Sequence, residues 1–522
     1  MNTNLYDNGR LLTGGFRGLR WQEFCEESLH KISWLYISWL ILVGFVAYVT
    51  YCVKRTDPVG SVQPSVLIYY LVIFVHLVFR LKRGGRAAVL GPDILFLLFY
   101  TMFHLGYVSL YGVGIVPYAN PPFVFESAIP KSLFVVNLGL ISFLLGFEIL
   151  GAKGYTTNLK APIIIPRPGW CTFGMGCMVT ATTVHLVVIG YVGVAFFKQY
   201  GYKAIQDIEK YTGSFLLALF WQYALYLMVL GLVIYVVSSA LRYGKLFKSK
   251  LAVVLVVLYI AFVILEGDRG PIVQLGAPIL LARHYLIERV RIRYLVGITA
   301  AVLVLFTAMA IARTIVFEPT RMVEEYEYQR TVGRVSWTSP FKEAGYSFRT
   351  LNITVHEVPL SEPYWKGASW RDAVLHIIPF FRGFALRRGW ARLGPSAWVT
   401  LTYYGLEAAG KGFTMAAEGY LNFGCLGVVI EMVFFGMFVR WLTVKFSKKP
   451  SAMWGIILVG CLGIVIMTVR EHTGITFSFC AQVMAVAAIL NLFVGNEPTP
   501  EYEAEGLSLL QEDNISLSPM HF

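Results

Sequence analysis

The sequence predicts an all-α, polytopic integral membrane protein with about twelve transmembrane helices and a long loop of short helices. Of its 522 residues, 57% are hydrophobic and only 14% are charged. A soluble domain is usually about 45–50% apolar and about 25% charged, so the composition excludes an ordinary soluble enzyme, a disordered chain and a coiled coil. The apolar residues form long runs, and each run must be a helix because the bilayer core leaves backbone groups no other partner.

Twelve apolar runs approach the length of about 20 residues that a membrane-spanning helix needs. The predicted spans are residues 32–53, 62–81, 92–116, 131–151, 170–197, 214–238, 251–265, 271–287, 294–317, 418–444, 452–469 and 474–494. The seventh and eighth spans are short and flank the sequence Glu-Gly-Asp-Arg-Gly at 266–270. We therefore expect these two spans to form a tight hairpin.

Basic residues in the loops predict the orientation, because cytoplasmic loops carry an excess of Lys and Arg. The loops after the second, fourth, sixth, eighth and tenth spans hold seventeen of them, whereas the short loops after the first, third, fifth, seventh and eleventh spans hold seven. The richer set is therefore predicted to be cytoplasmic, together with both termini. This topology also explains the net charge of +13, which in a soluble chain would suggest nucleic acid, and no nucleic-acid partner is expected.

The spans divide the chain into four parts. About a hundred residues between the ninth and tenth spans face outward, and their five tryptophans argue against disorder, in which aromatic residues are rare. We expect this loop to be a folded cap of short helices on the outer membrane surface. The predicted parts are an N-terminal membrane domain of about nine spans (1–317), the large outer loop or cap (318–417), three C-terminal membrane helices (418–495) and an acidic cytoplasmic tail (496–522).

Arginine is concentrated in the outer loop, where the orientation rule disfavours it. Its planar guanidinium grips phosphate oxygens two at a time, whereas lysine acts as a point charge. The densest part is 381–392, and no acidic residue between Asp372 and Glu407 neutralises it. This pattern predicts a site for a lipid pyrophosphate, with anionic lipid head groups and internal ion pairs as the alternatives. The candidate ligands are Arg382, Arg387, Arg388 and Arg392.

Two short outer turns add further candidates. Asp268 and Arg269 lie in the glycine-flanked turn of the predicted hairpin, which suits contact with phosphate, although snorkelling also places charge at a membrane boundary. Arg470, Glu471 and His472 form the last outer loop. A histidine beside a carboxylate and an arginine can act as a base or hold a phosphate, or it can anchor the helix ends at the interface.

A glycine-rich stretch, 410–424, leads into the tenth span and places Glu418 near the start of a helix. Glycines cluster where the backbone must turn or approach another group closely. Glu418 is a candidate general base or acceptor for a sugar hydroxyl. The alternative is that the helix dipole favours a carboxylate at this point without any chemical role.

Other charged residues lie inside the spans. Glu431 and Arg313 are deep in theirs, where pairing with each other or with other polar groups is expected. His76 and Arg80 share a helical face near the cytoplasmic end of the second span, where snorkelling accounts for them.

Several motifs are missing from the sequence. It has no Walker P-loop, no His-Glu-x-x-His and no Asp-x-Asp. Their absence weighs against ATP-driven transport and against a metal-dependent nucleotide-sugar transferase. No cofactor and no metal ion are expected.

Three features together resemble a known family. They are the stretch 410–436 with its Gly-x-Gly-Phe-Thr and Ala-Glu-x-Tyr-x-Asn-Phe-Gly motifs, the Asp-Arg-Gly-Pro at 268–271, and the long outer loop before the final spans. The sequence thereby resembles the Wzy-type oligosaccharide repeat-unit (O-antigen) polymerases of bacterial inner membranes.

The resemblance implies a glycosyltransferase of GT-C-like architecture that uses no nucleotide sugar. A growing glycan on polyprenyl pyrophosphate is transferred to the non-reducing end of a second lipid-linked repeat unit, at the periplasmic face of the inner membrane. The family typically carries arginines in two outer loops, for which Arg269 and the 381–392 group are the candidates. With Glu418 or His472 as the base that removes the acceptor proton, the candidate catalytic residues are Glu418, His472 and Arg269, and Tyr420, Asn422, Asp268, Arg470 and the outer arginines are candidates for binding substrate. The implied partners are the two lipid-linked oligosaccharides, membrane lipids and a chain-length regulator protein.

Two other functions stay open at this point. An O-antigen ligase, or another membrane glycosyltransferase, would use the same lipid donor with a different acceptor. A flippase or exporter of lipid-linked glycans would carry out no chemistry, but its charged residues should line a central path. Here the charges gather at the outer face, which favours chemistry there.

Overall fold

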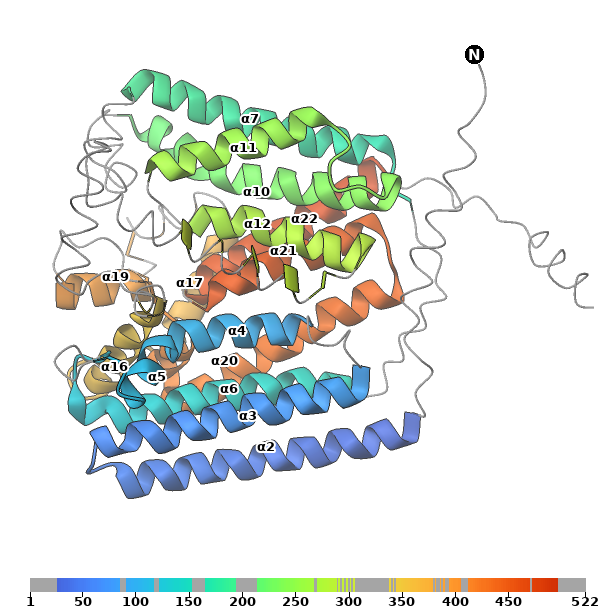
Figure 1. Cartoon of the computed structure of the whole chain (residues 1–522). Helices are drawn as coiled ribbons and strands as arrows, with labels where there is room; N and C mark the ends of the chain where they lie inside the picture. The colour runs from blue at the N-terminus through green and yellow to red at the C-terminus, as the bar shows by residue number, and fades with distance from the viewer. Residues whose placement is uncertain are drawn as a thin grey trace, which may run out of the picture.

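The computed structural model is a bundle of helices (Figure 1). It describes residues 26–84, 91–116, 122–152, 165–193, 214–266, 270–288, 290–291, 293–294, 297–298, 301, 304–305, 338, 341, 344–378, 381, 385, 388–389, 394–404, 412–469 and 472–495. No β-strand occurs among these residues. The predicted all-α, polytopic class is confirmed.

Seven helices in the described part of the chain are long and apolar enough to cross a membrane. They are α2 (Glu26–Lys54), α3 (Val62–Gly84), α6 (Ile129–Ala152), α7 (Pro168–Val192), α10 (Phe215–Tyr243), α20 (Met415–Lys448) and α22 (Thr473–Phe493). Helices α4 (Pro92–His104) and α5 (Gly106–Gly112) meet at a bend of 58° and qualify as one broken span.

Shorter apolar helices complete the set. They are α11 (Lys250–Glu266), α12 (Gly270–Ala282), which continues into the π-helical turn η5 (Arg283–Ile287), and α21 (Ala452–Thr468). Eleven of the twelve predicted spans thus coincide with helices, the third with the bent pair and the eighth with α12 and η5. The ninth, at 294–317, lies mostly outside the described residues.

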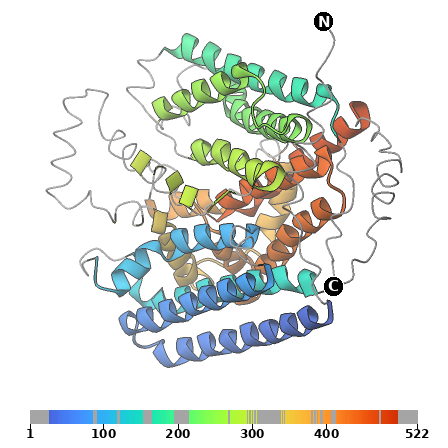
Figure 2. The ribbon, with the colours of Figure 1, turned by 45° about the vertical axis from the view of Figure 1, so that its right-hand side comes forward.

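Helices α20, α21 and α22 lie between two groups of helices, with α2, α3 and α6 on one side and α7, α10, α11 and α12 on the other (Figures 1 and 2). The closest contact is between α6 and α20. A Cβ atom on Gly436 would overlap the Phe143 carbonyl oxygen, and one on Gly146 would overlap the Val433 carbonyl oxygen. Glycine at both positions lets the two backbones touch, which is how membrane helices pack most tightly.

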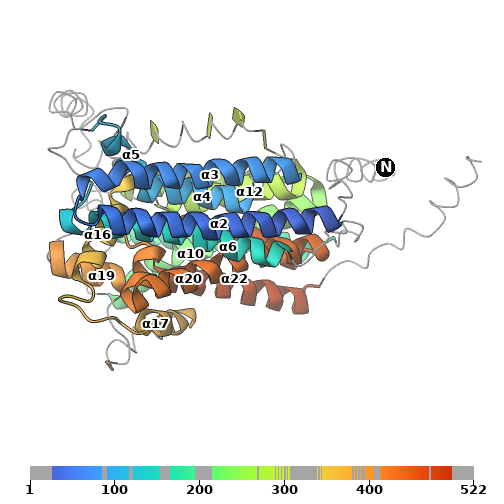
Figure 3. The same cartoon turned by 90° about the horizontal axis from the view of Figure 1, so that it is seen from below.

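Three short helices from the predicted cap gather at one end of the bundle (Figures 1 and 3): α16 (Ser347–Glu357), α17 (Ala368–Ile377) and α19 (Pro395–Val399). Helix α19 continues into the π-helical turn η6 (Thr400–Tyr404). The cap was expected to consist of helices on the membrane surface. Helix α16 differs from this expectation, because it packs against α4, α6 and α20 and most of its residues are buried.

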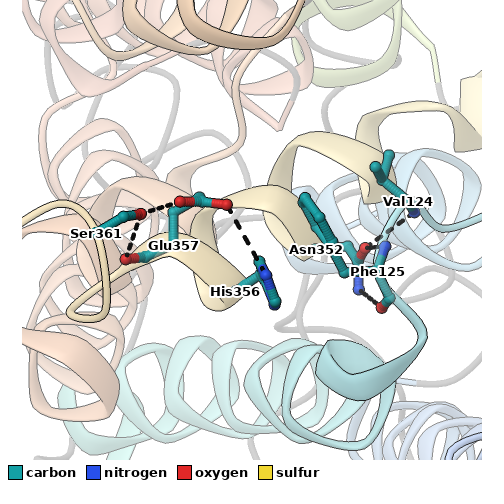
Figure 4. Close-up of polar contacts among 6 residues, drawn as sticks. All are labelled: Val124, Phe125, Asn352, His356, Glu357 and Ser361. Carbon is teal, nitrogen blue, oxygen red and sulfur yellow. Dashed lines mark hydrogen bonds and ion pairs between the residues drawn. The ribbon is translucent and has the colours of Figure 1, made fainter.

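The polar side chains of α16 explain its burial. The Asn352 amide oxygen accepts the Val124 and Phe125 N–H groups at 2.9 and 2.7 Å, and its nitrogen donates to the Phe125 carbonyl at 3.0 Å (Figure 4). The His356 ring stacks on Phe125 with 3.8 Å between ring centroids. Because these groups are satisfied inside the protein, the helix can be buried at small cost.

A second buried polar cluster lies away from the cap, where α2, α3 and α4 meet. The Asp93 carboxylate is fully buried and forms an ion pair with Arg80, whose Nε lies 2.8 Å away. It accepts a hydrogen bond from a terminal guanidinium nitrogen of Arg80 at 3.2 Å and one from His76 Nε2 at 2.9 Å. The other ring nitrogen of His76 bonds to the Tyr36 hydroxyl at 2.8 Å. His76 and Arg80 are therefore partners of Asp93, which replaces the expectation that both simply snorkel.

Candidate active site

Helix α20 is broken near its start, at Phe423 and Gly424. Gly424 has φ 61° and ψ −145°, a backbone conformation that residues with a Cβ rarely adopt. The break frees two carbonyl groups, and the cap uses both. Trp365 N–H donates to the Leu421 carbonyl at 3.0 Å, and Lys366 N–H donates to the Asn422 carbonyl at 3.1 Å. The segment before α17 is thereby fastened to the broken helix.

The Asn422 side chain connects α20 to the first residues of α17. Its oxygen accepts the Gly367 N–H at 3.1 Å, and its nitrogen donates to Ser369 Oγ at 2.7 Å and to the Glu418 carbonyl at 3.1 Å. Asn422 is fully buried. Its side-chain amide thus fixes the start of α17 against α20.

Glu418 is also fully buried and faces the start of α22. Its Oε2 accepts the backbone N–H of Thr473, the first residue of α22, at 2.6 Å. A carboxylate at a helix N-terminus is favoured by the helix dipole. Glu418 lies in the first turn of its own helix, α20, as the sequence had suggested, and it also meets the start of α22. The other oxygen, Oε1, is buried without a hydrogen-bond partner among the described residues.

A second carboxylate, Glu431, reaches the same residue from beyond the break. Its Oε1 accepts the Thr473 hydroxyl, and its Oε2 accepts the Trp370 indole N–H at 3.0 Å. Only 6% of Glu431 is exposed. Thr473 therefore donates to both carboxylates, with its N–H to Glu418 and its hydroxyl to Glu431. Trp370 of α17 connects Glu431 to the cap.

A small pocket lies above this network, between α17 and the start of α22. Its lining residues are Trp365, Ser369, Asp372, Ala373, His376, Gly394, Pro395 and His472. The His376 and His472 rings are 5.8 Å apart, edge to face. Ser369 lies beside the Glu418 carboxyl group and so connects the pocket to the buried network.

The pocket also has a charged rim. Asp372 is almost fully buried, and its Oδ1 accepts bonds from Arg371 Nε at 3.3 Å and from a terminal guanidinium nitrogen of Arg371 at 3.2 Å. The Arg371 side chain is 60% exposed. Arg371, next to the pocket residue Asp372, thus has a largely exposed side chain.

Of the predicted site residues, His472 lines this pocket, and Glu418 and Asn422 lie buried beside its lining residue Ser369. Tyr420 does not lie there, because it is two residues from Glu418 on the helix and so faces nearly the opposite way. Its hydroxyl donates to the Val358 carbonyl at 3.3 Å, and its ring lies 5.1 Å from the Lys131 ammonium.

Of the predicted charged site residues in the outer loops, the structure describes only Arg388 and His472. Arg388 is exposed in a turn. The other charged candidates lie outside the described residues: Asp268, Arg269, Arg382, Arg387, Arg392 and Arg470.

Sequence analysis missed four groups of the site: Ser369, Trp370, His376 and Thr473. Only Glu431 gave a signal, as a carboxylate inside an apolar span. Arg313, one of its two expected kinds of partner, lies outside the described residues. The structure pairs Glu431 with the polar groups of Trp370 and Thr473, which is the other expectation. Partners of this kind leave no local pattern in the sequence.

The fold and the site define an all-α membrane protein with a polar pocket where short cap helices meet a broken span. The family of the O-antigen polysaccharide polymerase Wzy matches residues 33–496, and the chain belongs to that family. No curated protein and no solved structure shows a significant match to the chain. Membership confirms the predicted family and supports a polymerase role in polysaccharide biosynthesis.

Proposed function

We propose that this protein polymerises polyprenyl-pyrophosphate-linked oligosaccharide repeat units at the periplasmic face of a bacterial inner membrane. Family membership supports the polymerase activity, and the excess of basic residues in the alternate loops supports an outward cap with cytoplasmic termini. The single observation that carries the proposed mechanism is the Glu418 carboxyl group, buried beside the pocket residue Ser369, with Oε1 lacking a hydrogen-bond partner among the described residues.

In this reaction, a hydroxyl at the non-reducing end of the new unit attacks the anomeric carbon of the growing glycan. A new C–O bond forms as the bond between that carbon and the pyrophosphate oxygen breaks. The proton of the attacking hydroxyl passes to Glu418 Oε1, with His472 as the second candidate base. Polyprenyl pyrophosphate leaves with the electron pair and is free for reuse.

Charge develops on the pyrophosphate as it leaves, and fixed cations at that point lower the barrier. Arg269 and the arginines of 381–392 are the proposed cations, with Asp268 and Arg470 nearby in the outer turns. Both lipid tails stay in the bilayer throughout. A chain-length regulator protein is the proposed partner that limits the product.

Purified protein reconstituted in vesicles with one lipid-linked repeat unit tests the function directly. A ladder of products differing by one unit is the expected result. A single transfer to another acceptor would instead identify a ligase. Movement of the lipid-linked unit across the bilayer without any new glycosidic bond would identify a transporter, and either outcome overturns the polymerase.

Replacing Arg269 or Arg388 with alanine should shift the product toward shorter chains at normal protein levels. Several arginines share the charge, so each loss should slow elongation about tenfold, less than the roughly 100-fold that loss of one donor costs a smaller site. The measurement is the length distribution of the reconstituted ladder. Arg167→Ala, at the start of α7, is the control. Unchanged lengths in both variants would leave head-group binding or ion pairs as the role of these arginines.

A further inference from the structure

We propose that Glu431 is a positioning residue for the transfer reaction, acting through Thr473 and Trp370. The inference rests on the proposed function, because it assigns Glu431 to the site at which Glu418 receives the proton. Glu431 itself does not line the pocket. It holds in place two groups that determine where Glu418 and the cap lie.

The contacts converge from three helices. Glu431 belongs to the part of α20 beyond the break, Trp370 to α17 and Thr473 to the first turn of α22. One oxygen of Glu431 accepts the Thr473 hydroxyl, and the other accepts the Trp370 indole N–H at 3.0 Å. Glu431 and Thr473 are 6% and 5% exposed, so little water can replace either partner.

Thr473 passes this constraint on to Glu418. The hydroxyl bond to Glu431 fixes the Thr473 side chain, and the Thr473 N–H is the donor that holds Glu418 Oε2 at 2.6 Å. Holding Oε2 determines the direction of Oε1, the oxygen without a hydrogen-bond partner among the described residues. Small errors in the position of a reacting group are costly, since a displacement of about 1 Å can slow a reaction by about 100-fold.

A carboxylate suits this position because both of its partners donate to it in this structure. The Trp370 indole N–H can only donate, and the Thr473 hydroxyl hydrogen points to Glu431. A glutamine would offer one oxygen and one NH2 group, so the Thr473 hydroxyl would have to accept from residue 431 and turn its hydrogen elsewhere. Glu431→Gln is therefore a nearly isosteric change that reverses the direction of one contact.

The test compares Glu431→Gln, Thr473→Val and Thr473→Ser in the full-length reconstituted protein. The first two should lower kcat for elongation by about 10- to 100-fold, with KM changed less than about twofold. Thr473→Ser keeps the hydroxyl and should retain most of the wild-type kcat. The matched control is Thr182→Val in α7, a buried threonine whose hydroxyl donates to the Met178 carbonyl of its own helix at 2.8 Å.

Hydrogen exchange of the peptide spanning the start of α22 supplies a readout that needs no activity. Exchange there should be faster in Glu431→Gln and Thr473→Val than in wild type, while peptides of α7 remain unchanged. Wild-type kcat in both variants, or unchanged exchange at α22, overturns the inference. If wild type makes no ladder but exchange responds as expected, the polymerase proposal fails and the positioning of Thr473 by Glu431 stands.

Discussion

Glu418→Gln should abolish formation of the long ladder, with a loss in the elongation rate of about 100- to 10,000-fold. Glutamine keeps a carbonyl oxygen that can accept the Thr473 N–H, so the contact at the start of α22 survives. What the variant loses is a group that can take a proton from the attacking hydroxyl. Single-turnover product formation measures the chemical step apart from substrate binding.

The matched control is Glu126→Gln, an exposed carboxylate in the 3-10 turn η4 (Glu126–Ala128), which contacts α16 and α6. It should elongate at the wild-type rate. His472→Ala separates the two candidate bases. If Glu418→Gln keeps full rate and His472→Ala does not, the histidine is the base and Glu418 serves only the dipoles at the starts of α20 and α22. If both keep full rate, neither residue is the base.

Asp93→Ala should destabilise the protein by about 3–5 kcal/mol, the usual effect of removing one partner of a buried ion pair. The variant leaves the Arg80 guanidinium, which is 12% exposed, and the buried His76 ring without their shared acceptor. Three helices, α2, α3 and α4, meet at this cluster. Thermal unfolding in detergent and the amount of protein in membranes measure the effect.

Removing the charge on both sides should restore much of the loss, so Arg80→Met combined with Asp93→Ala should be more stable than Asp93→Ala alone. Asp57→Asn is the control, because the pair of Asp57 and Lys54 at 3.2 Å is solvent-exposed and such pairs contribute little. The hydrogen bond from the Gly60 N–H and, to a smaller extent, the one from Lys54 lower the pKa of Asp57, so its carboxylate is charged at neutral pH. Equal stability of Asp57→Asn and Asp93→Ala would show that the buried cluster has no structural role.

Helices were predictable because each depends on a local run of apolar residues. Every predicted span that falls on described residues is a helix, including the short pair around 266–270 and the bent third span. The bend itself was not predicted, nor was the break in α20. Gly424 gave a hint of the break, but its position depends on Trp365 and Lys366 of the cap, which take the freed carbonyls.

The site shows the same division. The residue types of Glu418 and His472 and their places at helix ends suggested chemistry, and both lie at the pocket or beside it. Tyr420 lies two residues from both Glu418 and Asn422, and successive helical residues turn by about 100°. The sequence alone could therefore have placed Tyr420 on the opposite face of the helix from the other two. The motif was treated as a unit, although its residues face different neighbours.

Local pattern alone determined the helical membrane class, the approximate span boundaries and the family, because hydropathy and short motifs act over a few turns. Tertiary structure decided which polar groups meet. Thr473 lies 55 residues from Glu418, and Trp370 lies 61 residues from Glu431. Likewise, Asp93 becomes the partner of His76 and Arg80 only when α3 and α4 pack together. Such contacts depend on how whole helices pack and turn against one another, which no short stretch of sequence encodes.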